Sequence, residues 1–99
     1  MIINGTLDLS NCRELKNISG ITQIKGNLKL NNCNNLISLG DLEEVEAYLY
    51  LVNCKYLKSL GKLKNYNNQK GIRLARSGIT EQYIKREKSR LLKNCFWDY

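Results

Sequence analysis

The residues with the clearest chemical potential are three equally spaced cysteines, Cys12, Cys33 and Cys54. Aligned thiols are potential metal ligands, but structural zinc is held by four converging ligands, commonly Cys and His at short loop spacing. The chain contains no His, and no two of its cysteines are close in sequence. The sequence therefore predicts neither a metal site nor a cofactor site at this column.

Catalytic motifs are missing as well. Without His, a Ser or Cys nucleophile would need a Lys or carboxylate base, and no motif brings such a pair together. The seven glycines form neither a G-x-G-x-x-G loop nor a P-loop. The acidic cluster of Glu43, Glu44 and Glu46 is predicted to be a solvated edge, with binding of Ca²⁺ or of a basic partner as the alternative. We therefore expect a protein that is not an enzyme.

A 21-residue repeat explains the cysteine spacing. Eight columns recur in three copies without a gap, and their first members are Leu7, Leu9, Asn11, Cys12, Leu15, Ile18, Ile21 and Ile24. The leucine pair alternates with polar neighbours, as in a strand with one buried side. The later columns recur every third residue, which suits irregular or 3₁₀ turns. Because a unit of this length cannot hold a strand, a full helix and two connections, we expect the return path to be irregular or 3₁₀.

The L-x-L-x-x-C element resembles the L-x-L-x-x-N/C core of leucine-rich-repeat proteins. The resemblance covers residues 3–76 of a single domain, with repeats at 5–25, 26–46 and 47–67 and a degenerate repeat at 68–79. In the degenerate repeat, Ile72 and Leu74 form the strand pair, displaced by two residues. One departure is that Lys25 or Glu46 stands where a leucine is usual, three positions before the strand pair.

This resemblance implies an α/β-type repeat solenoid. The leucine-rich-repeat fold is a right-handed superhelix, mainly parallel β, whose strands line a concave face that usually binds a partner. We expect an irregular or 3₁₀ convex side and one capping α-helix near the C-terminus. In such repeats the cysteine column points inward, where a thiol acts as a small apolar group and a weak donor to carbonyls. Disulfides are not expected, because side chains in a parallel ladder point the same way.

The asparagine column also has a structural interpretation. Its members are Asn11, Asn32 and Asn53. Asparagine tolerates left-handed backbone and bonds its own loop, so it suits the turn that leaves each strand. Ligand binding by this column is the alternative. Cys95 lies outside the repeat and is predicted to be a free thiol.

The outward positions of the predicted strands give the candidate binding face. If each leucine pair points inward, its strand neighbours must point outward. The predicted partner contacts are Lys29, Tyr48, Tyr50, Val52 and Arg73. Aromatic residues and Arg are enriched at interaction hot spots, which favours protein binding. The alternative is that the tyrosines only suit strands.

Residues 80–99 are predicted to form a capping helix and tail. Thr80 can cap the helix N-terminus, Lys93 falls in the last turn and Asn94 ends it. Phe96 and Trp97 are then expected to fold back over the last repeat. From residue 70 onward, eight basic residues face three acidic ones, so most of the net charge of +7 lies here. The alternative function is therefore nucleic-acid binding through basic residues of the helix, namely Lys85, Arg86, Lys88, Arg90 and Lys93.

The opposite end has little to cover it. Only four residues precede the first repeat, so its core lies open unless Ile2 and Ile3 seal it, and an unpaired apolar edge invites self-association. Two explanations for this uncovered end remain open, namely a homodimer formed through it and a longer parent protein. The sequence has no apolar run long enough for a membrane span and no secretory segment, so we expect a cytoplasmic protein with no membrane partner. The small size and the wealth of Asn, Lys and Ile suggest, by analogy, a phage or mobile-element protein that binds and inhibits a host component such as a defence system.

Overall fold

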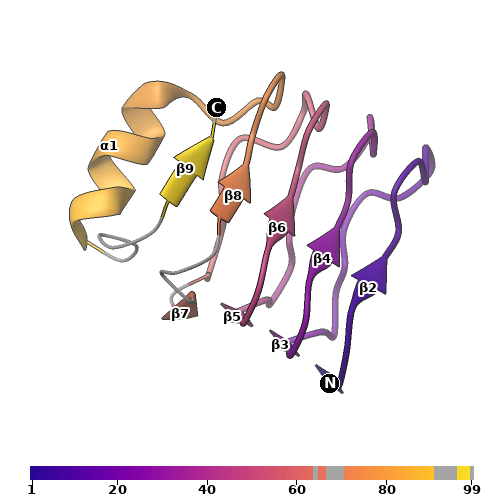
Figure 1. Cartoon of the computed structure of the whole chain (residues 1–99). Helices are drawn as coiled ribbons and strands as arrows, with labels where there is room; N and C mark the ends of the chain where they lie inside the picture. The colour runs from indigo at the N-terminus through magenta and orange to yellow at the C-terminus, as the bar shows by residue number, and fades with distance from the viewer. Residues whose placement is uncertain (64, 67–70, 91–95, 99) are drawn as a thin grey trace.

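Two parallel sheets and one short helix make up the fold (Figure 1). The computed structural model describes residues 1–63, 65–66, 71–90 and 96–98, and the side-chain surroundings of residues 1–63 and 71–87. The larger sheet has the order β2-β4-β6-β8-β9 and comprises Leu7–Asp8, Leu28–Lys29, Leu49–Tyr50, Gly71–Arg73 and Phe96–Asp98. The smaller sheet has the order β1-β3-β5-β7 and comprises Ile2–Ile3, Gln23–Ile24, Glu44–Val45 and Asn65–Tyr66.

The strand register follows the sequence repeat. Leu7 lies opposite Leu28, and Leu28 opposite Leu49, so neighbouring strands are one repeat apart. The next pairing joins Leu49 to Ile72, two positions beyond the repeat period, which confirms the predicted displacement of this strand. Each unit therefore places its strand beside the strand of the next unit, and the units follow one another across the sheet (Figure 1).

The smaller sheet corrects the prediction for the return path. We expected irregular or 3₁₀ structure throughout, but Gln23–Ile24 and Glu44–Val45 form the strands β3 and β5. Parallel pairing joins them in the same one-repeat register as the larger sheet. The apolar column that starts at Ile24 supplies one buried residue to each of these strands, which a two-residue strand can use. A period-three pattern hid this local alternation.

Leucine and isoleucine side chains from successive units fill the space between the sheets. Leu28, Leu30, Leu49 and Leu51 are completely buried. They belong to one continuous cluster that also contains Ile24 and Val45 from the smaller sheet and the later apolar columns. A single unit has no second layer of its own above or below it, so each apolar row is buried by its neighbours.

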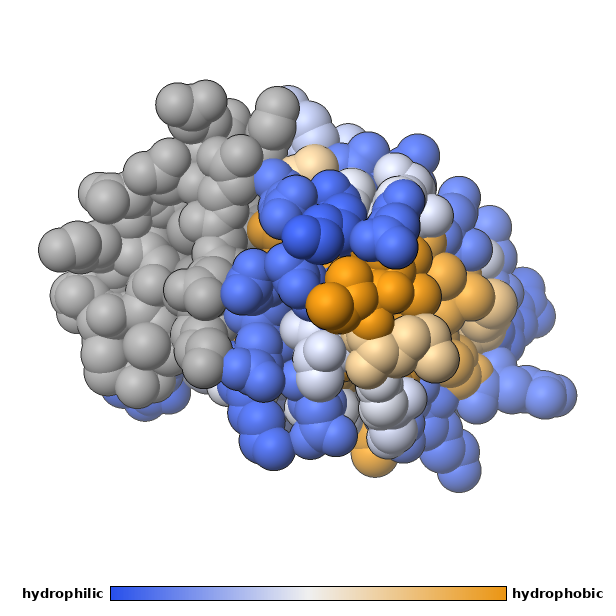
Figure 2. All heavy atoms as spheres, turned by 90° about the horizontal axis from the view of Figure 1, so that it is seen from below, coloured by the Kyte–Doolittle hydropathy of each residue, from blue (hydrophilic) through white to orange (hydrophobic). Residues whose placement is uncertain are grey.

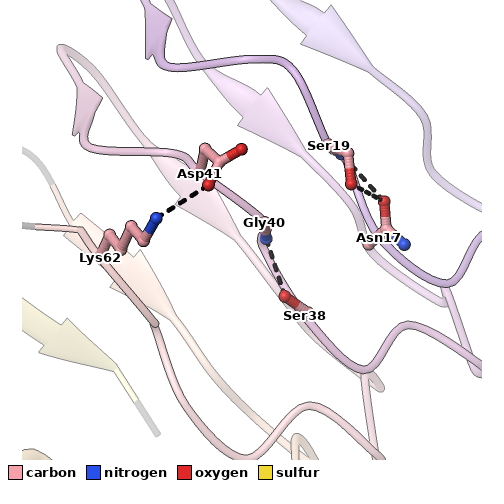
Figure 3. Close-up of polar contacts among 6 residues, drawn as sticks. All are labelled: Asn17, Ser19, Ser38, Gly40, Asp41 and Lys62. Carbon is pink, nitrogen blue, oxygen red and sulfur yellow. Dashed lines mark hydrogen bonds and ion pairs between the residues drawn. The ribbon is translucent and has the colours of Figure 1, made fainter.

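Polar contacts recur at the corners between the two sheets, and Figure 3 shows those of Ser38 with Gly40 and of Asp41 with Lys62. The Gly40 amide donates to Ser38 Oγ at 2.8 Å, and the equivalent Gly61 amide donates to Ser59 Oγ at 2.8 Å. Both glycines have positive φ, which glycine adopts at no steric cost. Lys62 Nζ lies 3.0 Å from Asp41 Oδ1, which belongs to the preceding unit, so an exposed ion pair also joins two units at this corner.

The helix α1, Glu81–Arg90, covers the end of the core as predicted. The Tyr83 amide donates to Thr80 Oγ1 at 3.1 Å, which confirms Thr80 as its N-cap. Ile84 is buried in the core cluster, and the amide of buried Leu60 donates to the Tyr83 hydroxyl at 2.8 Å. Lys93 and Asn94, where we expected the helix to end, lie outside the described residues, as does Cys95.

The C-terminal strand adds to the sheet. We expected Phe96 and Trp97 to fold back over the last unit, but their backbone forms β9, which pairs with β8 in parallel. Trp97 lies opposite Ile72 in this register. The larger sheet thus continues beyond the last repeat by one strand that has no counterpart in the repeat pattern.

The first unit is less covered than the others. Ile2 and Ile3 form β1, yet Ile2 remains exposed and Ile3 is only partly buried against the core. Seen from below, hydrophobic side chains gather in a patch bordered by hydrophilic residues (Figure 2).

Among the described residues, no helix combines the length and apolar character needed to cross a bilayer.

Candidate binding surfaces

The predicted contact residues lie together on the outer side of the larger sheet. Tyr48, Tyr50, Lys29 and Val52 are partly exposed and Arg73 is exposed, while the leucines that alternate with them are buried. Tyr50 pairs with Lys29 on one side and with Arg73 on the other in the strand register. The alternation predicted from the sequence is therefore correct, and it brings all five residues to one surface, which we call the tyrosine face.

Aromatic and cationic contacts organise the tyrosine face. The rings of Tyr48 and Tyr50 stack, with centroids 5.6 Å apart and an interplanar angle of 26°. Lys29 Nζ lies 5.9 Å from the centroid of the Tyr50 ring, within the range of a cation–π contact. The two rings and the ammonium group thus hold one another in place. A preformed arrangement loses less conformational freedom when a partner binds.

Polar side chains that flank the preceding strand hold the backbone on both sides of Tyr50. Asn27 Oδ1 accepts from the Tyr48 amide at 2.8 Å, and Asn31 Oδ1 accepts from the Val52 amide at 2.9 Å. Between these points, the amides of Leu28 and Leu30 donate to the carbonyls of Tyr48 and Tyr50, both at 2.9 Å. The asparagine side chains extend the ladder beyond the two-residue strand, so the backbone on both sides of β6 is hydrogen-bonded to the preceding unit.

The cysteine column is structural in the inner units. The Cys33 thiol donates to the Leu9 carbonyl at 3.1 Å, and the Cys54 thiol donates to the Leu30 carbonyl at 3.0 Å. Burial raises the pKa of both thiols, that of Cys54 to about 11. Cys12 is free and exposed, which corrects the expectation that the whole column points into the core. No unit of the described structure precedes it to cover the thiol.

The asparagine column forms a ladder of side-chain hydrogen bonds. Asn11, Asn32 and Asn53 all have positive φ, between 64° and 67°, as the turn interpretation predicts. Asn32 Nδ2 donates to Asn11 Oδ1 at 2.9 Å, and Asn53 Nδ2 donates to Asn32 Oδ1 at 2.6 Å. Each amide thus satisfies its neighbour, in agreement with a structural role for the column.

Arg76 continues this ladder in the fourth unit. Its φ is 58°, and its Nε donates to Asn53 Oδ1 at 2.6 Å. We assigned no asparagine equivalent here from the sequence. The two-residue displacement at Ile72, applied to the asparagine column as well, would have placed Arg76 opposite Asn53. The sequence therefore carries the same displacement for the asparagine column as for the strand pair.

An open groove runs beside the asparagine ladder. Its volume is about 660 Å³, and its lining consists of Asn11, Arg13, Asn32, Asn34, Asn53, Lys55 and Arg76. Arg13 and Lys55 occupy the same position in the first and third units, two residues after the asparagine column. The sequence did not reveal this groove, because only the tertiary structure shows that the turns leave a hollow between the two columns.

The remaining predicted charges are distributed over other surfaces. Lys85 and Arg86 lie exposed on α1, with Arg86 3.7 Å from Glu87, while the side chains of Lys88, Arg90 and Lys93 lie outside the described surroundings. In the acidic cluster, Glu44 Oε2 accepts from Gln23 Nε2 at 3.1 Å and Glu46 lies 3.7 Å from Lys25 Nζ. Within the described part of the chain, no three His, Cys, Asp or Glu side chains gather as a metal site would require.

Comparison with known proteins adds no relative. Protein-family models, curated protein sequences and solved structures were each compared with this chain, and none matches it. The function is therefore inferred from the surfaces described above.

Proposed function

We propose that the chain is a short leucine-rich-repeat solenoid that binds a protein partner through the tyrosine face and catalyses no reaction. The repeated strand register and the inward thiols of Cys33 and Cys54 support the solenoid assignment. The observation that carries the binding proposal is the stacked pair Tyr48–Tyr50 beside Lys29, partly exposed on the outer side of the larger sheet.

The chemistry of this surface suits a protein rather than a small molecule. Tyrosine and arginine supply large contact area together with hydrogen-bond donors, and they dominate the energetics of many protein interfaces. The face is part of a sheet and not a deep pocket, whereas sites for small ligands are concave and mostly enclosed. The small size and the composition of the chain suggest a phage or mobile-element protein, so the partner we expect is a protein of the host cell.

A comparison of matched tyrosine variants tests the proposal. The tagged protein is used to capture partners from bacterial lysate, and the captured partner is then purified and titrated against the Tyr50→Ala and Tyr56→Ala variants. Tyr56 is exposed outside the tyrosine face, so it controls for the loss of a surface ring. We expect Tyr50→Ala to weaken binding by about tenfold or more, the effect of a hot spot, and Tyr56→Ala to have almost none. Equal affinities for the wild type and a folded Tyr50→Ala variant would reject the surface.

The second candidate function is nucleic-acid binding through α1, where Lys85 and Arg86 are exposed. It predicts an affinity for DNA or RNA that falls steeply as salt increases. A gel shift at low ionic strength with the Lys85→Gln/Arg86→Gln variant separates the two candidates. Unchanged mobility of the nucleic acid with the wild-type protein would dispose of this alternative.

A further inference from the structure

The groove beside the asparagine ladder carries a positive charge. Three of its lining residues are cationic, Arg13, Lys55 and Arg76, and its described lining includes no Asp or Glu. Arg13, Lys55 and Arg76 are exposed. The Arg76 Nε is occupied by Asn53, but a guanidinium has five N–H donors, so its terminal amino groups still present a fork to the groove. Such a lining attracts anions, and arginine forks match carboxylates in particular.

Hydrogen-bonding groups line the floor between these cations. Asn32 and Asn53 each use one Nδ2 hydrogen and one Oδ1 lone pair for their neighbours, and Asn11 uses one Oδ1 lone pair. A side-chain amide has two donors and two acceptor sites, so each one retains hydrogen-bonding capacity. A peptide backbone offers the matching alternation of N–H and C=O groups.

The groove adjoins the tyrosine face directly. Val52 belongs to that face, and the next residue, Asn53, lines the groove. In the preceding unit, Asn31 and Asn32 are likewise consecutive: the side chain of Asn31 supports the face, and Asn32 lines the groove. A partner that extends along the strand direction therefore meets both surfaces without a break.

The tyrosine face by itself is too small for a typical interface. The face spans three strands, and three strands at about 4.8 Å spacing with about five residues of about 3.3 Å each give an area on the order of 240 Å². A stable protein complex usually buries about 800 Å² on each partner. A partner bound at the tyrosine face must therefore also cover neighbouring surface, and the adjoining groove is concave and charged.

We propose that the groove binds an acidic, extended segment of the same protein partner that contacts the tyrosine face, an inference that rests on the proposed function. Arg13 and Lys55 are two units apart, about 10 Å along the sheet. In a segment with polyproline-II conformation, residues three positions apart point to the same side and lie about 9 Å from one another. The segment is thus expected to carry Asp or Glu at a spacing of three, with its backbone along the asparagine ladder.

Labelled peptides test this assignment without the partner. The probes are fluorescein-labelled hexaglutamate, hexaglutamine and the DNA oligonucleotide octathymidylate, each titrated by fluorescence anisotropy at low salt. We expect hexaglutamate to bind more tightly than hexaglutamine. The Arg13→Gln/Lys55→Gln variant should weaken hexaglutamate binding by about tenfold, because two charge-assisted contacts are lost.

The chain offers a matched control. Lys16 and Lys58 occupy the same two units, three residues further along each, and both are exposed. The Lys16→Gln/Lys58→Gln variant removes the same charge outside the groove and should change affinity less than about twofold, as expected for exposed charges that make no direct contact. The Tyr48→Ala/Tyr50→Ala variant should bind hexaglutamate like the wild type, so failure of the tyrosine face and failure of the groove are distinguishable.

Three outcomes would overturn the inference. Hexaglutamate binding no better than hexaglutamine would show that the groove does not select acidic peptides. Equal losses in the groove variant and in its control would show attraction by net charge alone. Octathymidylate binding more tightly than hexaglutamate, with the same dependence on Arg13 and Lys55, would assign the groove to nucleic acid. Circular dichroism of each variant establishes that the fold is retained.

Discussion

The first and third units have the same residue types at most repeat columns but differ in what covers them. Leu51 and Cys54 in the third unit are completely buried, whereas Leu9 is partly exposed and Cys12 is exposed. The third unit lies between the second unit and β8, while β2 is paired on one side only within the described sheet. The burial of a repeat residue is thus set by the units on both sides and not by its column.

The two ends of the core differ for the same reason. Beyond the third unit, Ile72, Leu74, Ile79 and Ile84 extend the buried cluster, and α1 closes it. At the other end, Ile3 gives only partial cover. We therefore expect identical substitutions to have unequal effects along the chain, and four experiments, in order of falling effect, examine this difference.

Leucine truncation should show the largest contrast. Leu51→Ala removes a completely buried side chain and should lower the free energy of unfolding by about 3 kcal/mol. Leu9→Ala, in the same column of the first unit, should cost about 1 kcal/mol, because less apolar area is lost. Urea unfolding of both variants measures the two values. Equal losses would contradict the claim that neighbours decide burial.

The asparagine ladder should give the next largest effect. Asn32→Ala leaves a left-handed backbone at φ 64° to a residue that, unlike asparagine, cannot bond its own loop, and it breaks two ladder bonds, at a cost of about 2 kcal/mol. Asn11→Ala carries the same backbone strain but breaks only the bond from Asn32, so it should cost less. Asn→Gly substitutions at the two positions remove the strain and serve as controls. Identical costs at both positions would rule out an energetic role for the ladder.

Buried thiols should make stability depend on alkaline pH. Burial raises the pKa of the Cys54 thiol from 9.0 to about 11, so between these values the unfolded chain has released the proton that the folded chain keeps. Stability is therefore fully present below pH 9 and falls as pH rises, by about 1.4 kcal/mol at pH 10. Unfolding curves at pH 8 and pH 10 measure the loss. The Cys54→Ala variant, which has no such thiol, should show a correspondingly smaller decrease.

The helical cap should give the smallest effect. Tyr83→Phe removes the hydroxyl that accepts from the buried Leu60 amide and should cost about 1 kcal/mol. Thermal unfolding should then shift down by about 4–8 °C for a domain of this size. Tyr56→Phe removes a hydroxyl from an exposed ring and is the control. A shift that is the same in both variants would indicate that the hydrogen bond to the cap contributes nothing.

The period of the sequence predicted much of the fold. It indicated the strand pairs and the two-residue displacement at Ile72. The residue type indicated the left-handed asparagines, and the resemblance to leucine-rich repeats implied the inward thiols of Cys33 and Cys54. The cap at Thr80 followed from local chemistry, because an N-cap needs only its own side chain and the next turn. The smaller sheet was not predicted, because its buried residues belong to apolar columns that recur every third residue and show no alternation of the kind that marks a strand.

For the tyrosine face and the groove, too, the sequence determined one part and the tertiary structure the other. The sequence by itself determined which residues point outward, because side chains alternate along a strand whatever lies above or below it. Only the tertiary structure decided that Tyr48 and Tyr50 stack beside Lys29 and that Arg13, Lys55 and Arg76 line one hollow. It also decided that Cys12 is exposed while Cys54 is buried. The physical reason is that stacking distance, groove shape and burial are properties of neighbouring units, which a single repeat cannot specify.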